Sequence, residues 1–144
     1  MKNIFPLYFI ILFLSCTGSN SEKANNENIY RANNISIDFN PETNITYFSK
    51  KGEPLNGTVT QKMKDGFKST WQVENGLGTK QTVYYKNGAV ERILEMKEGV
   101  EHGMFVMFFP DGKKYVEQSY ENGKPVGTWK RWNISGELAE TKEH

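Results

Sequence analysis

The sequence predicts an all-β fold, an antiparallel meander of stacked β-hairpin repeats with a period of about 24 residues that forms an elongated sheet. Residues 99–112 and 123–136 share the spacing Gly-x3-Gly-x4-aromatic-x3-Gly, and each anchor of the second stretch lies 24 residues after its counterpart. Asn-Gly and Asp-Gly dipeptides, which are strong hairpin-turn signals, recur between β-rich runs without helical spacing. Repetition at a fixed period marks an architecture of stacked units.

Residues 1–16 have the pattern of a lipoprotein signal peptide. Lys2 gives a positive start, and the apolar run 4–14 is too short to span a bilayer as a helix. Residues 13–16, Phe-Leu-Ser-Cys, are similar to a lipobox in which Phe replaces the usual Leu, and Cys16 is the only cysteine. We therefore expect lipid attachment at Cys16 and a lipid-anchored location in the bacterial cell envelope, at the outer membrane or facing the periplasm. An ordinary signal peptide or an incidental cysteine is the alternative.

The segments that flank the repeats differ from them in composition. Residues 17–34 are rich in Asn, Ser and Glu, so we expect a flexible polar tether with a reach of roughly 20–25 Å. Residues 35–51 contain two runs of strand character around Pro41 and predict N-terminal capping strands, because the end units of repeat arrays are usually atypical. Residues 139–144 are polar and are expected to fray as a C-terminal tail.

The repeats occupy residues 52–138, where two less regular units precede the two clear ones. Each connecting stretch ends near an apolar position, held in turn by Val73, Met96 and Tyr120. Glycine adopts positive φ without steric cost, which tight turns require. We therefore assign structural turns to seven glycines: Gly66, Gly76, Gly88, Gly99, Gly112, Gly123 and Gly136.

The last unit shows a family resemblance. Residues 120–132, Tyr-Glu-Asn-Gly-Lys-Pro-Val-Gly-Thr-Trp-Lys-Arg-Trp, resemble the MORN repeat in the variant form of the bacterial YwqK-type antitoxin proteins, and the likeness extends over roughly 52–138. Ordinary MORN units carry a second glycine directly after the loop glycine, whereas Met104 and Thr128 stand at that place here, which favours the variant form. The resemblance implies a ribbon of stacked hairpins used for binding, with no catalytic residues.

Composition and motifs argue against catalysis and nucleic-acid binding. The formal net charge is +1, and removal of residues 1–15 takes away Lys2 and no acidic residue, so that basic and acidic residues then balance. Nucleic-acid binders normally carry a basic face. The two histidines, His102 and His144, have neither metal-ligand spacing nor a catalytic setting. We expect no enzyme activity, no cofactor, no metal and no nucleic-acid partner.

Two functions remain open. The first is a membrane-anchored, non-catalytic binding module that presents its sheet to a protein partner or another envelope component. The second is an immunity or antitoxin protein that neutralises a cognate toxin, which only the family resemblance implies. A toxin-like gene next to this one would favour the second, and an assembly role also stays open.

The two sides of the sheet carry different columns of side chains. Alternation along the strand at 104–109 places Phe108 on one side with Met104 and Val106. The 24-residue shift maps Phe108 onto Tyr84 and Trp132, and we assign this column to the core because it recurs in three units. Aromatic and arginine side chains on an exposed sheet are typical interface anchors. The predicted partner surface is therefore the other side, with Phe105, Met107, Phe109, Trp129 and Arg131. The alternative is that the N-terminal cap covers that side.

Overall fold

The computed structural model of the chain describes residues 28–63 and 66–144. The predicted signal peptide, the lipid-attachment residue Cys16 and the first part of the predicted tether lie outside the described residues, as does Asp65 of the first turn dipeptide.

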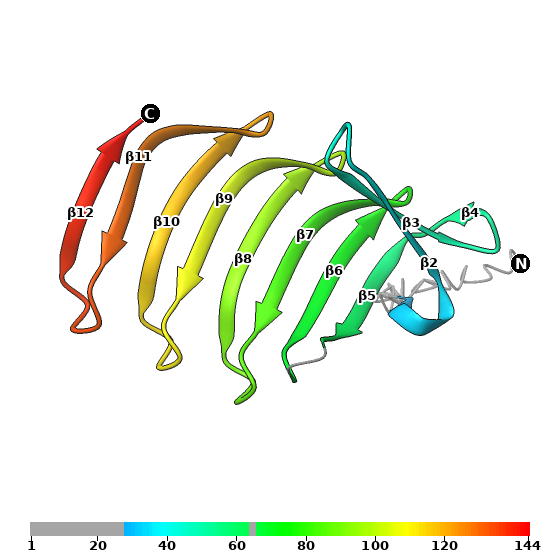
Figure 1. The fold of residues 1–144 in the computed structure, drawn as a ribbon, viewed down its shortest axis with the longest axis horizontal. Coiled ribbons are helices and arrows are strands. Elements are labelled where there is room, and N and C mark those ends of the chain that lie inside the picture. The colour runs from blue at the N-terminus through cyan, green and yellow to red at the C-terminus, as the bar shows by residue number, and fades with distance from the viewer. Residues whose placement is uncertain (1–27, 64–65) are drawn as a thin grey trace, which may run out of the picture.

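The chain forms one 12-stranded open sheet, which confirms the predicted all-β meander (Figure 1). β1 and β5 to β12 lie side by side in chain order, and every neighbouring pair in this row is antiparallel except β1 with β5. A short 3-10 turn, η1, covers Ala32–Asn34. The strands are β1 (Ile29–Arg31), β2 (Ser36–Asn40), β3 (Ile45–Lys50), β4 (Glu53–Pro54), β5 (Gly57–Lys62), β6 (Lys68–Glu74), β7 (Leu77–Tyr84), β8 (Val90–Lys97), β9 (Val100–Phe108), β10 (Lys114–Glu121), β11 (Lys124–Trp132) and β12 (Leu138–Glu143).

The hairpin turns at the two ends of the strands differ in type. At one end each turn has two successive residues with positive φ, of 51–52° and then 78–80°: Asn75 and Gly76, Glu98 and Gly99, and Asn122 and Gly123. Two successive residues with positive φ define the type I′ turn, whose twist matches that of antiparallel strands. At the other ends of the strands the glycine alone has positive φ in the turns at Gly88, Gly112 and Gly136, and Gly66 also has positive φ. All seven glycines assigned to turns from the sequence therefore have positive φ.

At the type I′ turns, backbone hydrogen bonds join each hairpin to the preceding one. The N–H of Gly99 donates to the carbonyl oxygen of Gly78 at 3.2 Å, and that of Gly123 donates to Glu101 at 2.9 Å. The N–H of Gly76 makes the corresponding bond to Leu55 at 2.8 Å. The turn glycine thus links successive units as well as reversing the chain, which gives a physical reason for the repeated spacing.

The second glycine of the motif prevents a clash inside the strand. Gly103 has φ of +101°, and a Cβ there would come within 2.6 Å of Glu95 Oε2. The same carboxylate accepts the N–H of Met104 at 2.9 Å. A side chain at position 103 would therefore displace Glu95 from this hydrogen bond.

The hydrophobic core lies where the N-terminal segment crosses one side of the sheet. Phe48 of β3 is fully buried against Val59, Val73 and Leu55, and its ring centroid lies 5.3 Å from that of Trp71. The N–H of Phe48 donates to the carbonyl oxygen of Gly76 at 2.8 Å. β2 and β3 thus form an antiparallel hairpin that caps the first strands of the row, and this hairpin is called the cap below.

Both expected boundaries of the ordered region need correction. Residues 29–31, which the sequence assigned to the tether, form β1, where Asn28 accepts the N–H of Thr58 at 2.8 Å. The C-terminal residues that were expected to fray form β12, which pairs with β11 over 128–132. β12 is exposed along its whole length and is held by backbone pairing, whereas β1 also contributes Tyr30, which packs against the hydrophobic core.

The expected core column is also wrong. Tyr84, Phe108 and Trp132 are only partly buried and lie on the side of the sheet opposite the cap. The Nζ of Lys68 lies 5.1 Å from the Tyr84 ring centroid, and that of Lys114 lies 5.7 Å from the centroid of Trp132. A sheet of a single layer has no interior along most of its length, so lysine side chains partly cover this column instead.

Candidate functional site

The strand register defines two faces of the sheet. Residues directly opposite each other in neighbouring strands point to the same side. One row of such partners runs Val59, Trp71, Gln81, Leu94, Phe105 and Gln118. This is the cap face, because Phe48 packs on its Val59 and Trp71. The other is called the opposite face.

The residues predicted as the partner surface lie together on the cap face, over β9 to β11. Met107 and Arg131 both pair with Val116 of β10, which places them in one row. Phe105 and Trp129 lie two residues earlier on the same strands and therefore point to the same side. Phe109 follows the end of β9 and packs on Tyr115 with ring centroids 4.9 Å apart.

β10 supplies aromatic residues to this surface that sequence reasoning did not include. The Tyr120 ring meets Phe105 edge-on, with centroids 6.3 Å apart. Tyr120 and Trp129 also line a shallow depression of about 370 Å³. Burial raises the pKa of the Tyr120 hydroxyl, and the carboxylate of Glu101 raises it further. The sequence did contain a signal, since Tyr120 holds the apolar position that Val73 and Met96 hold in earlier units.

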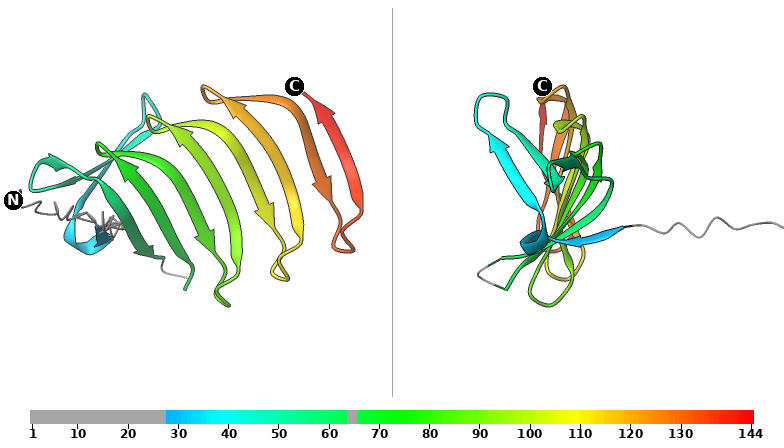
Figure 2. Two further views of the ribbon diagram at one scale, coloured as in Figure 1. Left: turned by 180° about the vertical axis from the view of Figure 1, so that it is seen from behind. Right: turned by 90° about the vertical axis from the view of Figure 1, so that its right-hand side faces the viewer.

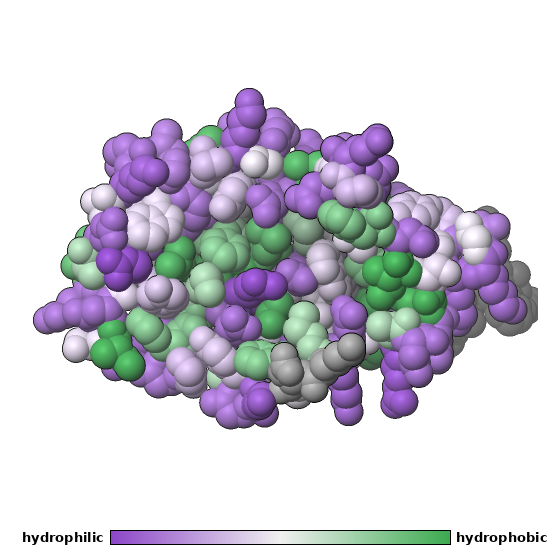
Figure 3. Space-filling model, in the orientation of Figure 1, coloured by the Kyte–Doolittle hydropathy of each residue, from purple (hydrophilic) through white to green (hydrophobic). Residues whose placement is uncertain are grey.

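The cap covers only part of this face. The predicted surface residues on β9 and β11 are all partly exposed, whereas Val59 and Val73 beneath the cap are buried. In Figure 1 none of the described segments lies in front of β10 to β12. Figure 3, in the same orientation, shows apolar residues gathered over the middle strands with hydrophilic residues around them. The alternative that the cap covers the whole face therefore fails over β10 and β11.

The arginine of the predicted surface is held in place from the neighbouring strand. Arg131 donates from both Nε and Nη2 to Glu140 Oε2, at 3.1 and 2.7 Å. This hydrogen bond raises the pKa of Arg131 above its ordinary value. The pair is exposed and contributes little to stability. Its effect is to fix the guanidinium beside Trp129, at the border of the aromatic residues.

A buried glutamine supports the middle of the surface. Gln118 is 3% exposed, and its Nε2 donates to the carbonyl oxygens of Ser119 and Val126 at 2.7 and 3.0 Å. These bonds stabilise the point where the β10–β11 register shifts. Its Oε1 accepts no hydrogen bond from the described residues. The floor of the surface between Phe105 and Trp129 is therefore polar and tightly held.

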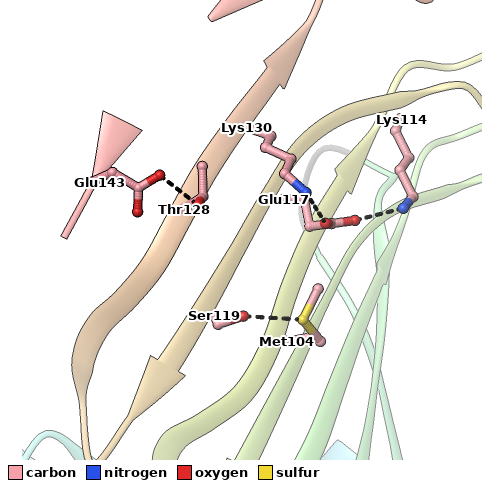
Figure 4. A network of polar contacts seen from close by, with 7 residues as sticks. All are labelled: Met104, Lys114, Glu117, Ser119, Thr128, Lys130 and Glu143. Carbon is pink, nitrogen blue, oxygen red and sulfur yellow. Dashed lines mark hydrogen bonds and ion pairs between the residues drawn. The ribbon is translucent and has the colours of Figure 1, made fainter. Parts of the chain in front are cut away.

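The opposite face of the same strands carries paired charges beside its aromatic column (Figure 4). Glu117 lies between two lysines, 2.5 Å from Lys114 Nζ and 3.8 Å from Lys130 Nζ. Thr128 donates to Glu143 at 2.6 Å. Cross-strand pairs of this kind are typical of a solvated sheet surface. The two faces of β9 to β11 thus differ in chemistry, and the cap face is the more aromatic.

Within residues 28–63 and 66–144, no group of three or more His, Cys, Asp or Glu side chains could hold a metal ion. None of the described residues forms a helix long and apolar enough to cross a membrane. No family model, curated protein or solved structure matches the chain.

Proposed function

We propose that the chain is a membrane-anchored, non-catalytic binding module built from MORN-like repeats, and that it presents the cap face of β9 to β11 to a protein partner. The observation that carries the proposal is the group of partly exposed aromatic, methionine and arginine side chains on one side of a single-layer sheet. Exposed apolar patches rimmed by polar residues usually mark contact sites. Tyr, Trp and Arg are the residue types that contribute most to protein interfaces.

Rigidity of the surface supports this role. The aromatic side chains extend from paired strands, and Arg131 is fixed by Glu140 before any partner arrives. Little side-chain freedom is then lost on association, which favours affinity. The opposite face of β9 to β11 carries the ion pairs of Glu117 with Lys114 and Lys130 and fewer aromatic side chains, which makes that side the weaker candidate.

Membrane attachment rests on the sequence alone. The short apolar run and Cys16 match a lipoprotein signal, and the polar residues that follow would separate the sheet from the membrane. An envelope location makes envelope proteins the first place to look for a partner.

Affinity capture from the native envelope with matched tryptophan variants tests the proposal. Trp129 and Trp132 lie three residues apart on β11 but on opposite faces. We expect Trp129→Ala to retain the fold and to reduce recovery of the partner at least tenfold, because its ring belongs to the proposed contact surface.

Trp132→Ala is the matched control and should recover the partner as the unchanged protein does. Circular dichroism of both variants verifies that each is folded. Equal recovery by the two variants would reject the cap face as the contact surface. If the captured protein is a toxin whose activity the chain suppresses, the immunity alternative takes the place of a general binding role.

A further inference from the structure

A cleft of about 450 Å³ lies under the far end of the cap. Its roof is the turn end of the β2–β3 hairpin, with Phe39 and Asn44, and its floor is the cap face at Trp71, Leu94 and Met96. Figure 2 shows the hairpin standing away from the sheet at this end. The volume falls in the range of small-ligand and side-chain pockets.

Phe39 points into the cleft without filling it. In the cap, Ile37 pairs with Phe48 and Phe39 pairs with Thr46, so Phe39 lies on the same side of the hairpin as the buried Phe48. Phe48 is fully buried, yet Phe39 is 60% exposed. An aromatic ring that faces the sheet but meets no floor leaves space for an apolar or planar group between itself and the strands below.

The cleft has a single negative charge. Glu101 is the only charged residue among those that line it, and its cross-strand partner Met96 belongs to the floor. Within the described residues Glu101 forms no ion pair. A cationic group is therefore the complementary ligand, and aromatic rings beside it would add cation–π attraction.

The cap is an example of an extended segment that lies across the type I′ turns. Tyr47 lies against the turn glycine Gly76, and Ile45 lies against the next one, Gly99. At the third turn, Gly123, no cap residue would meet an added Cβ, although Gly123 lines the cleft. The row of glycine turns thus continues beyond the end of the cap, where a second extended segment could lie.

We propose that this cleft binds a basic side chain, best an arginine, of an extended segment of the protein partner. The aliphatic stem lies over Met96, and the planar head stacks on Phe39 while it pairs with Glu101. Arginine suits such a site better than lysine because its flat guanidinium both stacks on rings and binds a carboxylate through two N–H groups. The proposal rests on the proposed function, in that the ligand belongs to a protein partner.

A pair of isosteric peptides tests the cleft without knowledge of the partner. The full chain is titrated with acetyl-Gly-Arg-Gly-amide and with acetyl-Gly-citrulline-Gly-amide, and amide and indole shifts are followed by nuclear magnetic resonance. We expect the arginine peptide to shift Gly99, Gly123 and the Trp71 indole, and to bind at least fivefold more tightly than the uncharged peptide.

Matched variants assign the effect to the residues named. Glu101→Gln should abolish the preference for arginine over citrulline, and Phe39→Ala should weaken both peptides. Glu74→Gln removes an exposed carboxylate outside the cleft and should leave the affinity for both peptides unchanged. Absence of shifts with the arginine peptide, equal binding of the two peptides, or an unchanged preference in folded Glu101→Gln would overturn the proposal. These outcomes are independent of the tryptophan capture experiment, so failure of the cleft and failure of the contact surface can be told apart.

Discussion

Individual glycines decide where this chain can turn and where its segments can approach one another. Gly57 illustrates the second role, because a Cβ at that position would overlap the carbonyl oxygen of Asn28 and prevent β1 from pairing with β5. At Gly112 only the first role applies, since φ is +86° and nothing lies within 4 Å of an added Cβ. The two roles can be separated by substitution.

Replacement of Gly112 with valine should destabilise the fold through backbone strain alone. We expect Gly112→Val to lower the free energy of unfolding by more than about 1 kcal/mol, because a β-branched residue rarely adopts positive φ. Circular dichroism melting of the full chain measures the change. Gly112→Asn is the control and should cost less, since Asn tolerates this region. An unchanged midpoint for Gly112→Val would contradict the turn geometry.

At the scale of the elements, the cap is attached through β3, which lies against two turn glycines, Gly76 and Gly99. Tyr47 pairs with Leu77 and lies over Gly76, while Phe48 fills the core beside Trp71. These contacts come from β3, whereas Phe39 of β2 remains 60% exposed.

A pair of alanine variants measures how much the cap attachment depends on Gly76. Gly76 and Gly88 have similar φ, +79° and +86°, but only at Gly76 would a Cβ overlap the Tyr47 ring, whereas Gly88 has open space around it. Both variants share the backbone strain. We expect Gly76→Ala to destabilise the protein by at least about 1 kcal/mol more than Gly88→Ala, because the cap must also shift. If chemical denaturation gave equal losses of unfolding free energy for the two variants, contact between the cap and Gly76 would be contradicted.

The sequence predicted those elements whose causes are local. Asn-Gly and Asp-Gly dipeptides fix tight turns through backbone preference, and the 24-residue period follows from repeated turns. β1 was missed because it has only three residues, and β12 because its mostly polar residues show no alternation; each depends on pairing with an adjacent strand.

The side-chain faces were predicted only in part. Alternation correctly grouped Phe105 with Met107 and separated them from Phe108, but alternation cannot say which side the cap will cover. The cleft under Phe39 was missed for the same reason, since it exists only where two distant segments meet.

At the scale of the whole molecule, the chain is a long sheet of one layer, held by backbone pairing and covered at one end. Such a sheet exposes much of both faces, in contrast to a sandwich, where a second sheet buries one face. Binding by such a sheet depends on which face is accessible to a partner and on the membrane to which the protein is anchored.

Substitution of Cys16 tests whether a lipid anchors the protein to a membrane. Cys16→Ser should move the protein from the membrane fraction to the soluble fraction and abolish incorporation of labelled palmitate, because stable anchoring needs acyl chains on this cysteine. Cell fractionation and metabolic labelling give the two readouts. A serine variant that remains membrane-bound and labelled would contradict lipid attachment at Cys16.

The central claim, that the uncovered cap face of β9 to β11 contacts the partner, is tested most directly by photo-crosslinking from adjacent residues of one strand. Met107 lies on the cap face and Val106 on the opposite face. Benzoylphenylalanine is introduced at each position in turn, and the cells that make the protein are irradiated. We predict a covalent adduct with the partner from position 107 and none from position 106. Adducts from position 106 alone, equal adducts from both positions, or no adduct from position 107 would contradict the claim.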